Sequence, residues 1–186
     1  MQEFIAWLVT FLVSVRPSGH LHDAACQQPD DEYRASVAHQ VDSAASVVFD
    51  EEESTIVRGP MALERSLVDV LAVAHHESMG WCKAVLTGER KGDHGHSSCA
   101  MGIMEFGGYA DGFPTSWLIE EPRVCYLVGY HRMKRSWGMC RGNPWPNLLV
   151  YASGRCDRGS KASREMLTTM NAWWGRAFAA WQAGEW

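Results

Sequence analysis

The segment MALERSLVDVLAVAHHESMG, residues 61–80, decides the fold class of this chain. Pro60 precedes it, where a proline suits the first turn of a helix, and Gly80 ends it. Between these two residues an apolar stripe recurs at helical spacing, formed by Met61, Leu63, Leu67, Val68, Leu71 and Ala74. The segment therefore predicts a core helix with Glu77 at its C-terminal end.

Similar patterns on both sides of this segment predict further helices. They are expected over residues 4–15, 30–49, 115–121, 122–137 and 160–184, with a short helix that ends at Tyr151. Between residues 81 and 112 the helical pattern stops, and seven glycines stand among short β-prone pieces. Residues 1–186 are therefore expected to form a single, mainly α domain with a short β-hairpin or loop insert.

Composition and charge exclude several classes of protein. The chain has 186 residues, of which 46% are apolar and 21% charged, as in a folded domain rather than a disordered or fibrous chain. The net charge of −5 hides an asymmetry, since residues 1–121 carry −12 and residues 122–186 carry +7. The basic residues of the second part are dispersed, so no nucleic-acid partner is expected.

The N-terminal segment contains an apolar run over residues 4–15, which is too short to span a bilayer. Gln2 and Glu3 precede it in place of the basic residues of a secretory signal, and no small-residue cleavage site follows directly. The run is interpreted as a buried first helix that ends near Pro17, with an export signal as the alternative. No stable membrane insertion is expected.

The six cysteines show no Cys-x-x-Cys spacing, which argues against zinc-ribbon and thioredoxin-type sites. Cys140 and Cys156 stand at loop ends near one short predicted helix. They are the pair expected to be joined if one disulfide forms, and free buried thiols are the alternative.

Glu77 has the setting that a general acid needs. Met79 and Trp81 place apolar groups beside it, and a glycine-rich segment follows. Apolar surroundings disfavour the ionised carboxylate and raise its pKa, so that it can hold a proton near neutral pH. The alternative is an ordinary solvated glutamate at a helix end.

Four segments, in order along the chain, carry a resemblance to a known family. They are Val73–Ser78, Gly92–Ser97, Ala100–Glu105 and Tyr151–Cys156. Together they resemble motifs of the lytic transglycosylases, lysozyme-like enzymes of bacteria and bacteriophages that cleave peptidoglycan. In that family a helix ends in Glu-Ser, a stretch similar to Gly-Asp-Gly-Gly-Arg-Ser precedes Ala-Met-Gly-Leu-Met-Gln, and a motif such as Tyr-Ala-Ser-Gly follows.

The resemblance implies a lysozyme-like fold and a role for each matching residue. Glu77 would act first as acid and then as base on the β-1,4 bond between N-acetylmuramic acid and N-acetylglucosamine. Ser78 would orient Glu77 or contact sugar. The other residues expected to contact the glycan are Asp93, Gly102, Ile103, Met104, Glu105 and Tyr151. No metal or cofactor is implied, and a monomer is expected.

Glu105 departs from the family, which has glutamine at this place. A glycoside hydrolase needs two carboxylates, whereas a transglycosylase needs one, because the 6-hydroxyl of muramic acid attacks and leaves an anhydro sugar. The candidates for a second carboxylate are Asp93, Glu105 and Asp111. A muramidase of the lysozyme type is therefore the alternative enzyme, and a non-catalytic glycan-binding domain is the alternative outside enzymes.

Two other reaction classes fit less well. A zinc-protease motif fails because Gly80 stands where the second histidine is required, although a looser site that joins His75 or His76 to His94 and His96 remains open. A serine hydrolase fails because residues 95–99 lack the Gly-x-Ser-x-Gly pattern.

The nine tryptophans are many for a chain of this size. Trp81 and Trp145 lie beside the family motifs and are predicted to stack on sugars. The others that we assign are predicted to pack inside, as are two methionines: Trp7, Trp117, Trp173, Trp174, Trp181, Met166 and Met170.

An enzyme of the bacterial cell wall without a convincing export signal suits a bacteriophage endolysin or virion protein, with an exported bacterial protein as the alternative.

Overall fold

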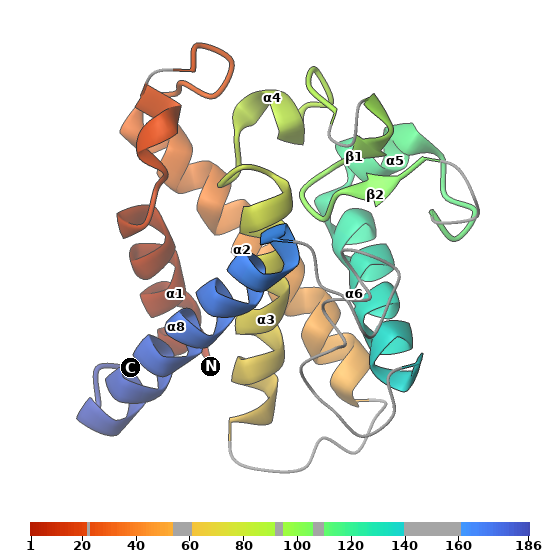
Figure 1. Cartoon of the computed structure of the whole chain (residues 1–186). Helices are drawn as coiled ribbons and strands as arrows, with labels where there is room; N and C mark the ends of the chain where they lie inside the picture. Colours follow the sequence, from red (N-terminus) through yellow and green to blue (C-terminus); the bar gives the residue numbers. More distant parts are fainter. Residues whose placement is uncertain (22, 54–60, 92–94, 106–109, 140–160) are drawn as a thin grey trace.

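The computed structural model describes residues 1–21, 23–53, 61–91, 95–105, 110–139 and 161–186. Within these ranges the chain is mainly α, with seven α-helices, one short 3-10 helix and a two-stranded antiparallel hairpin (Figure 1). The elements are α1 (Gln2–Ser14), η1 (Ser18–Leu21), α2 (Asp30–Glu53), α3 (Ala62–Glu77), α4 (Lys83–Leu86), β1 (Ser97–Ser98), β2 (Ile103–Met104), α5 (Thr115–Glu120), α6 (Pro122–Met139) and α8 (Lys161–Ala183).

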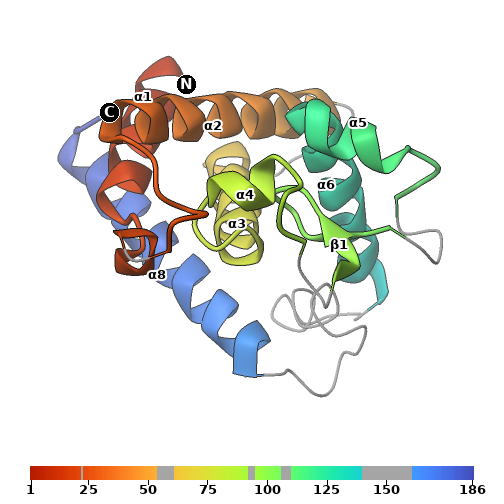
Figure 2. The ribbon, with the colours of Figure 1, turned by 90° about the horizontal axis from the view of Figure 1, so that it is seen from above.

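Helix α3 lies at the centre of the fold, as its sequence predicts. The long helix α2 packs against α1, α3 and α6, and α8 covers another side of α3 (Figure 2). Five consecutive residues of α3, 70–74, are buried, so this stretch of the helix is enclosed on all sides. The end of α3 is thus held by the core, and the residue that ends it, Glu77, has a fixed position.

Helix boundaries agree with the sequence patterns at most places. Pro122 begins α6 directly after α5, as expected for a proline in a first helical turn. Helix α1 buries Phe4, Leu8 and Leu12 in the core, which agrees with the interpretation of this run as a buried first helix. The sequence pattern gave no signal for the short α4, and the helix expected to end at Tyr151 lies outside the described residues.

Two disulfides join parts of the chain that are distant in sequence. Cys26 is bonded to Cys82 and Cys99 to Cys125, so these four cysteines are not the free thiols that were the alternative above. The partners are 56 and 26 residues apart, and spacing alone gives no sign of either pair. The predicted pair Cys140–Cys156 lies outside the described residues.

The tryptophans divide between core and surface differently from the prediction. Trp173 is buried with Met166 and Met170, as expected, but Trp117 and Trp181 are 52% and 43% exposed. Helical spacing places Trp181 on the same face as Trp174, where both tryptophan rings lie against Phe178, a residue that is itself exposed. Among the described helices, none combines the length and apolar character that a membrane span requires.

Candidate functional site

Glu77 is the last residue of α3 and is half-buried, and the turn that follows fixes its place. The side chain of Ser78 is completely buried. Its hydroxyl group donates a hydrogen bond to the carbonyl of Ala74 at 2.6 Å and accepts one from the backbone N–H of Trp81 at 2.9 Å. A buried hydroxyl that is bonded in both directions ties the end of α3 to the turn that follows it.

The turn after Ser78 has an uncommon backbone conformation. Met79, Gly80 and Trp81 all have positive φ, at 56°, 76° and 59°. Such angles are expected for glycine but cost about 1–3 kcal/mol at other residues, and they persist only where the surroundings enforce them. At Gly80 a Cβ atom would lie 2.3 Å from Cγ of Pro17, so that only glycine fits.

Long-range contacts enforce this turn. His20, in η1, binds the carbonyl of Met79 through Nε2 at 2.5 Å, and the hydroxyl of Tyr33 donates to the carbonyl of Gly80 at 3.3 Å. The Cys26–Cys82 disulfide attaches the end of the turn to the segment after η1. Strain of this kind is commonly found at functional sites.

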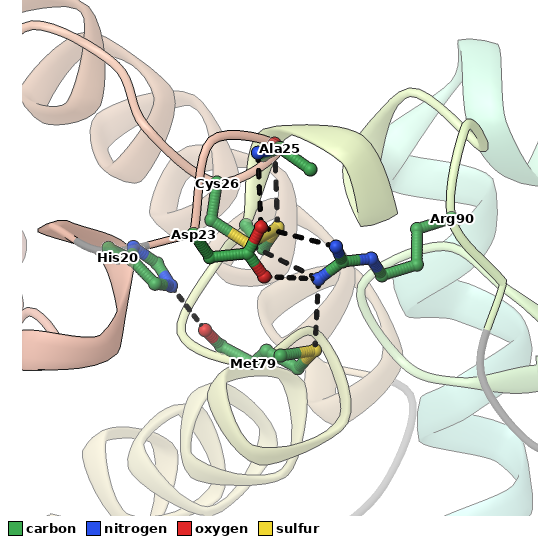
Figure 3. A network of polar contacts seen from close by, with 7 residues as sticks. His20, Asp23, Ala25, Cys26, Met79 and Arg90 are labelled. Atoms are coloured by element: carbon green, nitrogen blue, oxygen red, sulfur yellow. Dashed lines mark hydrogen bonds and ion pairs between the residues drawn. A yellow bond between two sulfur atoms is a disulfide. The ribbon is translucent and has the colours of Figure 1, made fainter.

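Arg90 and Asp23 complete the same network (Figure 3). The guanidinium of Arg90 donates to both carboxylate oxygens of Asp23, at 2.6 and 3.2 Å, and lies 3.7 Å from Sγ of Cys26. The hydrogen bond from Arg90 lowers the pKa of Asp23, with a further contribution from the backbone N–H of Ala25. Residues 67 positions apart are joined in this way, and the sequence carries no signal that pairs them.

The hairpin approaches Glu77 from the other side. Gly102 precedes β2 with a φ of +59°, and its backbone lies directly against the Glu77 side chain. A Cβ atom at Gly102 would be 2.6 Å from Oε2 of Glu77 and 3.2 Å from Cβ of Glu77. The structure thus brings together two of the sequence segments singled out above, 73–78 and 100–105. Ile103 is wholly buried and Met104 partly buried, so the Ile103 side chain belongs to the core.

Glu105 is tied to its own hairpin. Its carboxylate accepts hydrogen bonds from the hydroxyl of Ser98 and from Nζ of Lys91, at 2.8 Å for the latter, and its backbone N–H donates to the carbonyl of His96. Burial by itself would raise the pKa of Glu105, but the hydrogen bonds from Lys91 and Ser98 and the charge of Lys91 outweigh it and lower the pKa. Glu105 is therefore held ionised at neutral pH.

The other expected carboxylates have different surroundings. Asp111 accepts a hydrogen bond from Arg135 of α6 at 3.0 Å. Asp93 lies outside the described residues, as do Tyr151 and Trp145. Of the expected site residues that are described, Gly102 contacts Glu77 directly, while Glu105 belongs to the same hairpin.

Trp81 and His75 pack against each other at the end of α3. Trp81 is fully buried, which makes the prediction that it stacks on sugar wrong. His75 lies edge-on between Trp81 and Trp173, with both ring centroids 5.0 Å away. Burial lowers the pKa of His75 to about 4, with smaller contributions from His20 and His76, so that its ring is neutral at pH 7. Trp81, which the sequence indicated as an apolar neighbour of Glu77, packs in the core.

Within the described ranges no three histidine, cysteine or acidic side chains converge as metal ligands, and the looser site through His94 involves a residue outside them. Sequence reasoning missed three residues of this network: His20, Asp23 and Arg90. Their contacts form only in the folded chain, where η1 lies against the end of α3. Comparisons with protein families, with curated protein sequences and with solved structures found no match to this chain.

Proposed function

We propose that this protein is a peptidoglycan lytic transglycosylase with a lysozyme-like fold and with Glu77 as its catalytic acid and base. The observation that carries the proposal is the contact between Gly102 and the Glu77 carboxylate. The backbone of a hairpin glycine lies against a glutamate that ends a core helix, and this is the close backbone approach that the resemblance implies for Gly102. The resemblance of both segments to family motifs supports the same function.

In this mechanism Glu77 first donates a proton to the oxygen of the bond between N-acetylmuramic acid and N-acetylglucosamine. The bond breaks as positive charge develops on the muramic acid ring. Glu77, now ionised, takes the proton of the 6-hydroxyl group of the same sugar while that oxygen bonds to the anomeric carbon. Protons balance, no water is consumed, and the product ends in a 1,6-anhydro ring.

Two of the three candidates for a second carboxylate are described by the structure. Glu105 accepts hydrogen bonds from Lys91 and Ser98, and Asp111 accepts one from Arg135. We place the transglycosylase before the muramidase because the ordered motifs resemble a family whose reaction needs one carboxylate, whereas a hydrolase needs two.

The two disulfides support a site of action outside the reducing cytoplasm, since such bonds persist in oxidising compartments. The bacterial wall is such a place, and it would be reached by a phage lysis protein, by a virion component or by an exported enzyme.

The products of cleavage test the proposed reaction. Purified peptidoglycan treated with the protein is expected to yield fragments with anhydromuramyl ends, identified by mass spectrometry as lighter by one water than reducing ends. Reducing ends would identify a hydrolase. An absence of any fragment, with binding to the polymer retained, would identify a glycan-binding domain.

Glu105→Gln restores the residue that the family has and tests whether Glu105 takes part in the chemistry. Cleavage is expected to stay within about tenfold of the wild-type rate, well short of the loss typical of a general acid or base. The free energy of unfolding should fall by up to about 1 kcal/mol at pH 7, because Lys91 and Ser98 lose a charged acceptor. The folded-state pKa of Glu105 is lowered, so its contribution is present above the unfolded pKa and is lost as the pH falls through the folded pKa.

The difference in stability between the two proteins should therefore shrink in acid, as followed by urea unfolding at several pH values. If Glu105→Gln reduces cleavage to the level of a Glu77 variant, Glu105 is a second catalytic carboxylate and the muramidase mechanism replaces the one proposed.

A further inference from the structure

A buried glycine lies inside α6, the helix beside which the hairpin packs (Figure 1). This residue, Gly129, stands between Pro122, which begins α6, and Met139, which ends it. A glycine inside a helix lowers stability relative to alanine, because it loses more conformational freedom when the chain folds. The helix itself therefore gives no reason for a glycine at this position, and the reason lies in what packs on it.

Met101 of the hairpin fills the space that a side chain at Gly129 would need. Met101 is fully buried, and a Cβ atom at Gly129 would lie 2.6 Å from its Cε, 2.7 Å from its Cγ and 2.8 Å from its Cβ. These distances are far below the contact distance of carbon atoms, about 3.5–4.0 Å. Rotation of the methionine side chain can move Cγ and Cε, but Cβ is fixed to the backbone. An alanine at position 129 would therefore push the backbone of the hairpin away from α6.

The hairpin turn is attached to the same side of α6 by two further contacts. Residues 99–102 form the turn between β1 and β2. Cys99 is bonded to Cys125, and the backbone N–H of Met101 donates to Sγ of Cys125 at 3.3 Å. Cys125 and Gly129 are four residues apart and thus lie on one face of the helix. This face of α6 fixes the place of the turn.

The other side of the turn meets Glu77. Gly102 follows Met101 directly, and its N–H donates to the carbonyl of Cys99 at 3.1 Å, which closes the turn. The backbone of Gly102 lies so close to Glu77 that a Cβ atom there would be 2.6 Å from Oε2. The turn is thus held between α6 and the end of α3, and a displacement of Met101 away from α6 also moves Gly102.

We propose that Gly129 is a positioning residue for Glu77. Its missing side chain lets Met101 pack directly on α6, and this sets how closely Gly102 approaches the carboxylate. Gly129 acts only through Met101 and Gly102, so it affects the placement of the reacting group and hence the chemical step. The inference rests on the proposed function and gives α6 a part in it.

Gly129→Ala tests the proposal, with Gly175→Ala as its matched control. Gly175 also lies inside a helix, α8, but a Cβ atom there would have no heavy atom within 4 Å. Both substitutions replace a helical glycine by a better helix former, and only Gly129→Ala disturbs Met101. Met101→Ala acts on the same contact from the hairpin, and it replaces Gly129→Ala if that variant does not fold. Circular dichroism and thermal unfolding verify that each variant is folded.

The first measurement does not depend on cleavage. In isotope-labelled full-length protein, the NMR signals of the Gly102 amide and of the Glu77 carboxyl carbon report on their contact. Both signals are expected to shift in Gly129→Ala and to keep their positions in Gly175→Ala. Signals that stay in place in Gly129→Ala would overturn the proposal, because the turn would then not have moved relative to Glu77.

The second measurement separates kcat from KM in the cleavage of soluble, uncrosslinked glycan strands. Gly129→Ala is expected to lower kcat by at least about tenfold and to leave KM within about twofold, since the chemical step is changed and binding is not. Gly175→Ala should match the wild type. A loss confined to KM, or a kcat equal to that of Gly175→Ala, would overturn the proposal. If the wild type does not cleave glycan, the proposed function fails, and the NMR signals still decide whether Gly129 sets the contact between Gly102 and Glu77.

Discussion

Replacement of Glu77 by glutamine is expected to abolish the cleavage of peptidoglycan. Glutamine has the shape of glutamate but cannot donate the proton that the leaving oxygen needs or take one from the 6-hydroxyl group. Since the proposed mechanism uses Glu77 in both roles, the rate should fall by about 10³–10⁴-fold or below detection. The measurement is release of soluble anhydromuropeptides from purified peptidoglycan, quantified by liquid chromatography and mass spectrometry.

The fold should survive this change. Glu77 is half-buried at the end of a helix whose core residues are untouched, so the melting temperature is expected to change by only a few degrees. Glu64→Gln is the matched control, because it makes the same change in the first turn of the same helix, about 20 Å away. Cleavage by Glu77→Gln at the wild-type rate would remove the proposed mechanism, whatever the products are.

The central helix shows how much of the fold the sequence can predict. The apolar stripe of residues 61–74 predicts a helix with one buried face. The prediction holds because helical periodicity depends only on residues that are near one another in the sequence. Pro122 likewise separates α5 from α6, because a proline fits the first turn of a helix but not its interior. Where a local rule decides the conformation, prediction and structure agree.

The surroundings of Glu77 depend on contacts that no local rule contains. The sequence pointed to Glu77 and to Gly102 separately, and only the fold places Gly102 against the carboxylate. For Trp81 the prediction from sequence was wrong. Its position near Glu77 in the sequence indicated a sugar contact, but the positive φ of the turn directs it into the core.

The Cys26–Cys82 disulfide and the hydrogen bond from His20 are also contacts that no local sequence rule predicts. They join η1 and its following loop to the turn after Ser78, across more than fifty residues. Short segments such as η1 and residues 23–28 carry few periodic signals, because their conformation is set by the surfaces on which they lie. The contacts that hold the turn after Ser78 therefore cannot be predicted from sequence patterns.

Gly102→Ala tests the contact on which the proposed function depends. The added methyl group would lie 2.6 Å from Oε2 of Glu77 and 3.2 Å from its Cβ and Cδ atoms, so the Glu77 side chain must shift. Such a shift displaces the reacting group, and a displacement of about 1 Å can lower an enzymatic rate by about 10²-fold. The expected result is a loss of this size in kcat/KM for peptidoglycan.

Gly112→Ala separates this effect from backbone strain. Gly112 has a φ of +85°, comparable to the +59° of Gly102, but a Cβ atom there would meet nothing within 4 Å. Both variants should lose about 1 kcal/mol of unfolding free energy in urea, because alanine tolerates positive φ poorly. Only Gly102→Ala should lose activity. If the two lose activity equally, the close approach of the hairpin to Glu77 has no catalytic meaning, and the resemblance of residues 100–105 to the family motif would be left without a physical role.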